Sequence, residues 1–522
     1  MKLLSLQNNA LFLKNWRERM RPPTILASAT VMMLIIVLII VGNYLGHETR
    51  ESMGHLYDKH SPPVSWLRLA FFQIAMLQGF ILLLLGSHAA NKMARQERIS
   101  GTLDFHRCSP TSRIDQIIGI VFGAPILEWC LFLGSLLLSF LLALFSGMNS
   151  VVFCAFYVAF ILCAVFYHSL AIIVGICSNQ KKQQAGIIPL LLLSWLIMPF
   201  FFALQLSTLY YMTFIPMYSF LTKHTVDLYA SLYPHQITWE WNVNSLFACP
   251  LRFPLLQFLV QLPLIVFIWA MLKRKISYIE KSILSKSQLV VFIMLLLFYF
   301  IGSASTLIVS ENQYAFPHEA LMGLFLYIIV GVLFIGSIIA TPTQLMYQKG
   351  LNRAKKLGLR RLSLSDDQNS NWLWLIVACF AVTGMYYIFL RFTETAFLKR
   401  ILFLVVLLSQ CASFAGALEW FRLSKHHEKM VVFWVSLSIL WIFIPLFGLI
   451  TKTMSSSPYY LQYFFSPSPL FSIPLFCQSL FEPSKDILIH ISVFLLVNLS
   501  LAATATYAAF RERLHLRNTI LQ

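Results

Sequence analysis

Apolar runs of about 18 residues or more recur from one end of this 522-residue chain to the other. Each run is long enough to cross a hydrocarbon core of about 30 Å as a helix. Only 11% of the residues are charged and 58% are hydrophobic, whereas about a quarter of an ordinary soluble domain is charged. The chain is therefore predicted to be an all-α polytopic membrane protein.

We expect about twelve transmembrane helices. The first apolar run is too long for a signal peptide and no small-residue cleavage pattern follows it, so it is counted as a span. The predicted spans are 24–45, 65–88, 116–146, 151–177, 185–206, 253–272, 288–309, 319–340, 372–391, 401–421, 431–451 and 486–509.

The position of the positive charges predicts the topology. The net charge is +18, but with the N-terminus inside, most Lys and Arg residues fall in inner loops, among them 273–275 and 349–361. Basic residues accumulate on the cytoplasmic side of membrane proteins. We therefore expect a multi-pass protein of the plasma (cell inner) membrane with both termini in the cytoplasm. Membrane lipid, and no nucleic acid, is the expected partner of these charges.

The layout of the chain indicates two similar halves. Residues 11–21 place Phe12, Trp16 and Met20 at four-residue spacing, the stripe of a helix that lies in the membrane interface. The stretch ISYIEKSILSK repeats this pattern just before the seventh span. In each half, two spans lead to a charged inner loop, 89–115 or 341–371, and a long outer segment precedes the sixth span. We predict a first half at 1–275 and a second at 276–522, in one orientation.

Motifs for common membrane enzymes are missing from the sequence. It has no GxxxxGK[ST] phosphate loop, so ATP hydrolysis by this chain alone is not expected, and it has no GxSxG, HExxH or EF-hand pattern. No catalytic residue, metal site or bound cofactor is predicted. Cys249 and Cys477 both fall in outer segments and are a candidate disulfide that non-reducing digestion would test.

Two ionisable residues lie inside predicted spans, where charge is costly and often functional. Glu128 lies about 18 Å into the third span and His168 about 14 Å from the inner end of the fourth, at 1.5 Å per residue. The pair is expected either to lock two helices or to line a transport path. Gly119 and Gly123 form a GxxxG that predicts close helix packing, and Pro125 predicts a kink with a freed carbonyl near Glu128.

The segment between the second and third spans is unusually polar. Residues 95–113 read RQERISGTLDFHRCSPTSR. We expect a surface helix over 91–108 that carries Arg95, Arg98 and Asp104 to water. Ser109 and Pro110 resemble an N-cap followed by proline at the first helical position, which predicts that a new helix begins there.

This segment resembles the "ER-x-x-GTLE … SP-x-S" stretch of type-2 ATP-binding-cassette (ABC) permeases. In that family it lies between the second and third spans of a six-span unit and forms the coupling helix that docks on the ATPase subunit. Residues 11–21 are similar to the family's elbow helix. The matching positions of the loop are Glu97, Arg98, Gly101, Thr102, Leu103, Asp104, Ser109, Pro110 and Ser112.

The resemblance implies a permease in the fused two-half, 12-span form, with a coupling helix near 92–108 and ATP bound by a separate cytoplasmic ABC ATPase subunit. Residues 1–275 match the family best. In the second half, the loop 341–371 is divergent and strongly basic, with no recognisable Gly-Thr. An exporter of an amphipathic or lipid-like substrate is the expected function.

Three other readings are open. An ion-coupled secondary transporter using Glu128 and His168 predicts transport without a nucleotide-binding partner. A membrane-embedded enzyme acting on lipid or glycan predicts activity from the purified chain alone, through outer residues such as His224 and Asp227. A non-transporting anchor for a cytoplasmic ATPase is the third.

Overall fold

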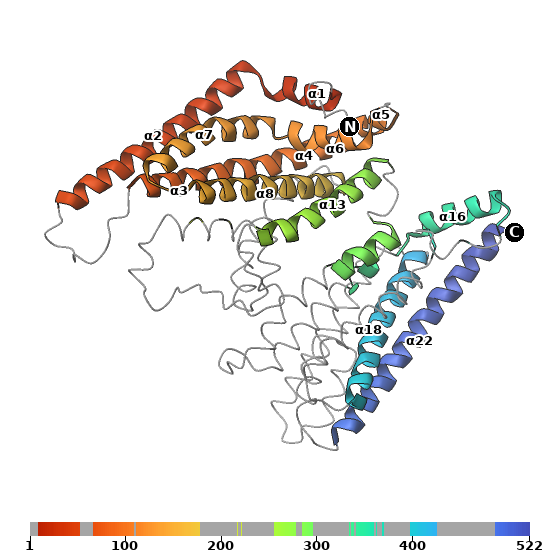
Figure 1. The fold of residues 1–522 in the computed structure, drawn as a ribbon. Helices are drawn as coiled ribbons and strands as arrows, with labels where there is room; N and C mark the ends of the chain where they lie inside the picture. Colours follow the sequence, from red (N-terminus) through yellow and green to blue (C-terminus); the bar gives the residue numbers. More distant parts are fainter. Residues whose placement is uncertain are drawn as a thin grey trace, which may run out of the picture. The chain divides into compact units, whose positions relative to one another are not determined.

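The computed structural model describes the helical parts of the chain (Figure 1). The described residues are helical or lie in turns, and no strand occurs among them. The described ranges are 9–52, 66–108, 111–177, 217, 221, 255–277, 284–295, 333–334, 336–338, 341–359, 362, 368–369, 397–424 and 486–521.

Among the described residues, four helices are long and apolar enough to cross a membrane. They are Pro22–Thr49, Trp66–Ile99, Ile126–Phe145 and Ser150–Cys177, and they coincide with the first four predicted spans. The prediction of an α-helical membrane protein is therefore confirmed in its general form. Helices α13 (Leu255–Ser277), α18 (Phe397–Leu423) and α22 (Asp486–Leu521) lie where the sixth, tenth and twelfth spans were predicted. The number twelve stays a prediction, because the other predicted spans lie largely outside the described residues.

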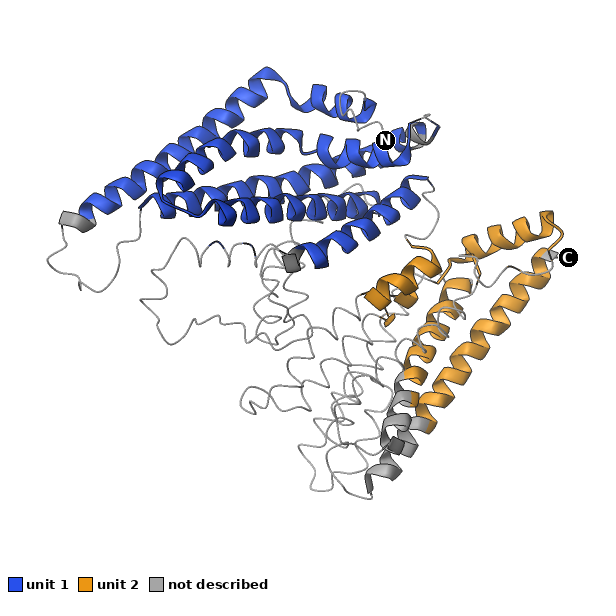
Figure 2. Ribbon diagram, viewed as in Figure 1, with its two compact units in different colours: residues 1–279 blue, residues 280–522 orange. Residues whose placement is uncertain are grey.

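The chain divides into two compact units, residues 1–279 and 280–522 (Figure 2). The predicted boundary between the halves fell at 275/276. Of the two predicted interfacial helices, the first is present as α1 (Ala10–Arg19). Most of the second, ISYIEKSILSK, lies outside the described residues.

The core of the first unit is an aromatic stack between α7 (Ile126–Phe145) and α8 (Ser150–Cys177). The rings of Phe132 and Phe160 are stacked 5.1 Å apart, and both side chains are fully buried. Beside them runs one long helix with three parts: α3 (Trp66–Gly79), a π-helical turn (Phe80–Leu85) and α4 (Gly86–Ile99). By contrast, α2 (Pro22–Ser52) is exposed over most of its length, as expected of a helix that faces lipid.

The predicted third span, 116–146, is two helices. Helix α6 (Arg113–Gly123) ends before Pro125, and α7 begins at Ile126. Proline has no N–H to donate and disfavours helix in the residue before it, so the predicted kink is a complete break. Only α7 qualifies as a candidate span. Glu128 therefore lies in the first turn of α7, and the depth expected for it stays a prediction.

The predicted surface helix over 91–108 is also interrupted. Helix α4 ends at Ile99, and a separate helix, α5 (Thr102–Cys108), follows Gly101. The next helix does not begin at Ser109–Pro110, which lie outside the described residues. Its N-cap is Ser112, whose hydroxyl accepts a hydrogen bond from the Asp115 backbone N–H (3.1 Å) and donates to the Asp115 carboxylate (2.6 Å). This reciprocal cap fixes the helix start three residues later than predicted.

The second unit is built on α18 and α22, which run parallel to each other and are in contact along their lengths. A Cβ at Gly416 would lie 2.9 Å from the Thr506 backbone nitrogen, so only glycine permits this approach. Glu419 and Arg513 form an ion pair across the same interface (3.4 Å), and both side chains are largely buried. The pair thus brings two chain segments together through small residues and one charge pair.

Helix α16 (Gln344–Lys356) packs against this pair within the loop 341–371. Its buried Tyr347 and Leu351 form a small core with Leu423 of α18 and Leu516 of α22. Burial raises the pKa of the Tyr347 phenol, which therefore stays neutral. The loop that the sequence marked as divergent thus contains an ordered helix.

We predict that Gly175→Ala lowers the thermal stability of the chain in detergent. A Cβ there would meet the Asn91 carbonyl oxygen at 2.6 Å, so α4 and α8 must separate. Gly134→Ala is the matched control, because nothing lies within 4 Å of its added Cβ. We expect a lower unfolding temperature for the first variant and no loss for the second; equal behaviour of the two would contradict this packing.

Candidate functional site

The candidate site is centred on the short helix α1, which lies across α6 (Figure 1). Asn9 caps α1: its side-chain oxygen accepts hydrogen bonds from the backbone N–H groups of Leu11 and Phe12. The amide nitrogen of the same side chain donates to the Asp115 carbonyl in α6. One residue therefore starts α1 and fixes it to α6.

The two glycines of the GxxxG motif make room for α1. A Cβ on Gly119 would lie 2.6 Å from the Asn9 side-chain oxygen, and one on Gly123 would lie 3.2 Å from the Phe12 Cα. Asn15, which is buried, donates to the Gly119 carbonyl at 3.4 Å. The motif thus does serve close helix packing, and the helix it accommodates is the interfacial one.

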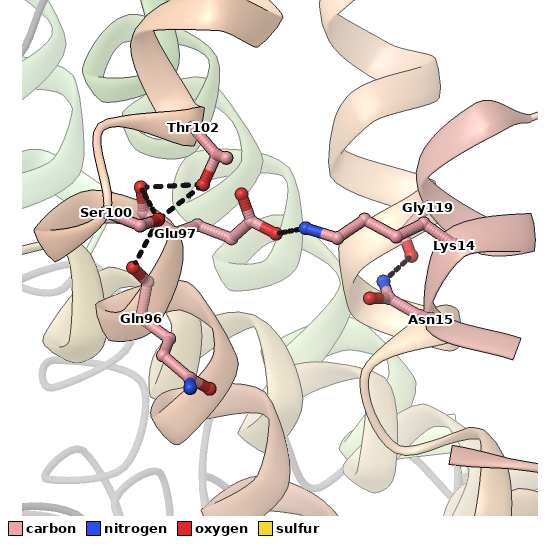
Figure 3. A network of polar contacts seen from close by, with 7 residues as sticks. All are labelled: Lys14, Asn15, Gln96, Glu97, Ser100, Thr102 and Gly119. Carbon is pink, nitrogen blue, oxygen red and sulfur yellow. Dashed lines mark hydrogen bonds and ion pairs between the residues drawn. The ribbon is translucent and has the colours of Figure 1, made fainter. Parts of the chain in front are cut away.

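The first ion pair of α1 joins it to the end of α4. The Lys14 ammonium binds the carboxylate of Glu97, whose side chain is only 6% exposed (Figure 3). The family resemblance of this loop implied that Glu97 takes part in the contact with a separate ATPase subunit. In the structure its carboxylate faces α1 within the same chain.

The second ion pair joins α1 to α7. The Arg19 guanidinium donates two parallel hydrogen bonds to Glu128, at 2.9 Å and 2.8 Å. It also donates to the carbonyl of Ala124, at the break before Pro125. The Glu128 side chain is 8% exposed and that of Arg19 31%. A bidentate guanidinium–carboxylate pair fixes the distance and the orientation of its two side chains. Arg19 therefore holds α1 against the start of α7 and also binds the Ala124 carbonyl at the helix break.

Glu128 and His168 do not pair with each other. The His168 Nε2 lies 2.9 Å from the carbonyl oxygen of Leu82 in the π-helical turn, and its ring packs edge-on against Trp129, with ring centroids 5.7 Å apart. Because a carbonyl only accepts, Nε2 must carry a proton. His168 therefore provides a hydrogen-bond partner for the Leu82 carbonyl in the π-helical turn. Its role in a transport path, and that of Glu128, stay predictions.

The Gly-Thr of the loop shapes the turn between α4 and α5. Gly101 has φ +75°, a region that favours glycine, and nothing lies within 4 Å of an added Cβ, so backbone conformation is the constraint. The Thr102 hydroxyl donates to the Glu97 carbonyl at 3.2 Å and lies 2.6 Å from the Ser100 hydroxyl (Figure 3). The turn therefore links α5 directly to the residue that binds Lys14.

The remaining predicted coupling residues have different surroundings. Arg98 donates to the Ile176 carbonyl near the end of α8, and Leu103 is 2% exposed. Arg95, expected in water, is 8% exposed, because α4 lies against α8 over this stretch. The side chain of Asp104 lies outside the described residues, as do Ser109 and Pro110.

Two features were missed from the sequence. Phe105 of α5 is 71% exposed, although its type would normally predict burial. Gln78 of α3 is fully buried in a polar cluster: its amide donates to the hydroxyls of Ser135 and Ser139, and it accepts from the Tyr157 hydroxyl at 2.7 Å. The sequence signal for this cluster is the presence of uncharged polar residues inside apolar runs, whereas the prediction considered only the ionisable residues there.

The Arg19–Glu128 pair is predicted to couple the two residues energetically. Breaking a buried pair costs about 3–5 kcal/mol; since Arg19 is partly exposed, we expect about 2 kcal/mol from Arg19→Gln. Unfolding by SDS in mixed micelles, with Arg19→Gln, Glu128→Gln and the double variant, measures the interaction energy. We expect about 1–2 kcal/mol, whereas additivity within about 0.5 kcal/mol would contradict the pair. The exposed Arg17→Gln on the same helix is the control.

Comparison with known proteins does not assign this geometry to a family. No protein-family model matches the chain, and neither a curated protein nor a solved structure matches it. Among the described residues no group of three or more His, Cys, Asp or Glu side chains is arranged to hold a metal ion. The function is therefore argued from the contacts of α1, α4, α5 and α7.

Proposed function

We propose that the chain is the permease subunit of an ATP-driven transporter of the type-2 ABC kind, energised by a separate cytoplasmic ATPase. The observation that carries the proposal is the connected path from the exposed helix α5 to the candidate span α7. The first part of that path lies in QERISGTLDFHRCSPTSR, the stretch that resembles the family.

The path begins with a surface suited to a protein partner. Helix α5 presents Phe105 at 71% exposure, and exposed aromatic side chains are typical anchors in protein interfaces. The predicted topology puts this helix in the cytoplasm, where an ATPase would meet it. We therefore propose Phe105 for the ATPase contact that the family resemblance implied for Glu97.

From α5 the path continues through polar contacts. Thr102 binds the Glu97 backbone and the Glu97 side chain binds Lys14. Five residues further along α1, Arg19 holds Glu128 in the first turn of α7. Coupling between distant sites requires contiguous packed or hydrogen-bonded elements, and this chain of contacts is one. A push on α5 would therefore reach a membrane helix through α1.

A driven permease fits the chain's chemistry better than a self-sufficient enzyme. The sequence has no phosphate-binding loop, so a transporter built this way takes its energy from outside. The alternative use of Glu128 as a proton carrier gains no support from the geometry, because both carboxylate oxygens accept hydrogen bonds from the Arg19 guanidinium. The cargo we propose is amphipathic or lipid-like, in keeping with an apolar chain rich in aromatic residues, and export is its proposed direction.

The proposal predicts that a P-loop ATPase co-purifies with the full chain from its native membrane in mild detergent. Phe105→Ala is expected to reduce the amount of bound ATPase at least tenfold, the effect of losing about 1.4 kcal/mol or more at an anchor residue. Phe145→Ala is the matched control, since Phe145 is equally exposed at the opposite end of α7.

Two results would overturn this proposal. One is the absence of any P-loop ATPase from the purified chain. The other is equal retention of the ATPase by the Phe105→Ala and Phe145→Ala variants, which would place the contact elsewhere. Unfolding temperatures of both variants show that the comparison is made between folded proteins.

A further inference from the structure

Helix α16 of the second unit has two different faces. Tyr347, Gly350, Leu351 and Ala354 are buried against α18, α22 and their surroundings. The opposite stripe, Leu345, Lys349, Arg353 and Lys356, is exposed. The buried residues lie at positions i, i+3, i+4 and i+7, and the exposed ones recur every three or four positions, so each set lies on one side of the helix. The first face is occupied by the protein, and the second needs an explanation.

The helix is firmly held in place. The Thr343 side chain caps its start by accepting from the Met346 backbone N–H. At its end Gly358 has φ +68°, and the backbone N–H of Leu359 donates to the Ala354 carbonyl at 2.9 Å, which closes the last turn. Lys355 donates to the carbonyl of Ile520 near the end of α22. The exposed stripe is thus carried by a rigid element.

The exposed surface is strongly basic. Helix α16 carries four Lys and Arg residues and no acidic one. Residues 511–521 of α22, which pack beside it, add Arg511 and Arg517 against one Glu, whereas Arg513 is largely buried in its pair with Glu419. A partner that fits this surface must be anionic.

The exposed surface is also apolar at its edges. Leu345, Leu357 and Leu359 are 59%, 62% and 53% exposed, and Leu514 of α22 is 42% exposed. Leucines among cations fit a lipid surface, where headgroups are anionic and hydrocarbon lies directly beneath. Nucleic acid would offer the charge without the apolar layer.

The position of α16 along α22 matches that partner. Leu516, which α16 covers, lies seven residues beyond the predicted end of the last span, or about 10 Å at 1.5 Å per residue. The headgroup layer on each side of the hydrocarbon core is about 5–8 Å deep. Lys and Arg side chains are long enough to reach it from there.

We propose that α16 binds anionic lipid headgroups at the inner membrane surface through Lys349, Arg353 and Lys356, with Leu357 and Leu359 entering the interface. This inference rests on the membrane placement of α22 and is independent of the ATPase. It gives the divergent loop 341–371 a role of its own: holding the inner ends of α18 and α22 at a charged leaflet.

The test uses the full chain in nanodiscs of phosphatidylcholine, with or without phosphatidylglycerol. A bimane label on Leu357→Cys reports contact with brominated lipid by quenching, after subtraction of the signal from the labelled wild-type chain, which has exposed cysteines of its own. We expect stronger quenching in the anionic nanodiscs. Each cation contributes about a five-fold preference for an anionic surface. The double variant Arg353→Gln with Lys356→Gln is therefore expected to lower about 25-fold the ratio of label in contact with lipid to label in water.

Lys92→Gln with Lys273→Gln is the matched control, because both are exposed lysines of the first unit. It is expected to leave the quenching unchanged. Equal quenching in the two lipid compositions overturns the proposal, as does equal loss in the control. Protection of the label by a co-purified cytoplasmic protein, regardless of lipid charge, also overturns it and assigns the face to a protein. Loss of the ATPase contact at Phe105 would leave this result untouched, so the two proposals fail separately.

Discussion

The pairing of two buried carboxylates with one short helix determines the arrangement of the first unit. A buried charge costs several kcal/mol unless a partner neutralises it, and Glu97 and Glu128 are both nearly inaccessible to water. Their partners, Lys14 and Arg19, lie five residues apart on α1, or about 7.5 Å along its axis. Moving α1 relative to either α4 or α7 would break one of these two ion pairs. The three helices therefore move together or lose stability.

Two backbone features make these pairs geometrically possible. The glycines of α6 let α1 approach closely enough for its short side chains, Asn9 and Asn15, to bond to backbone carbonyls. The break at Pro125 then turns the Ala124 carbonyl and the Glu128 carboxylate toward the same guanidinium. A substitution at one of these glycines or at Pro125 would therefore weaken the ion pairs although it changes no charged residue. This explains how a motif typical of span-to-span packing serves an interfacial helix.

Local sequence signals predicted much of the fold and little of the site. Apolar run length sufficed for the first four spans, because hydrophobic thickness fixes helix length. Glu128 does not meet His168 because it is bonded to Arg19, which lies more than a hundred residues away in the sequence, on a helix expected only at the membrane surface. Likewise Ser109–Pro110 was preferred as a helix start although Ser112 and Asp115 form the reciprocal cap. Each miss involves a partner that adjacent residues do not reveal.

The two loops predicted to lie on the inner side are held by different forces, and this bears on how the proposed two-half permease would work. The first loop is held by ion pairs and hydrogen bonds to α1, which have steep directional dependence and so transmit displacement. In the second, α16 is held by Tyr347 and Leu351 in an apolar core, and hydrophobic burial is non-directional. Because its contacts are non-directional, α16 can stay packed against α18 and α22 when these helices make small movements. In the permease that we propose, the first half would receive a push at α5, and the second half would keep its place at the membrane while that push is delivered.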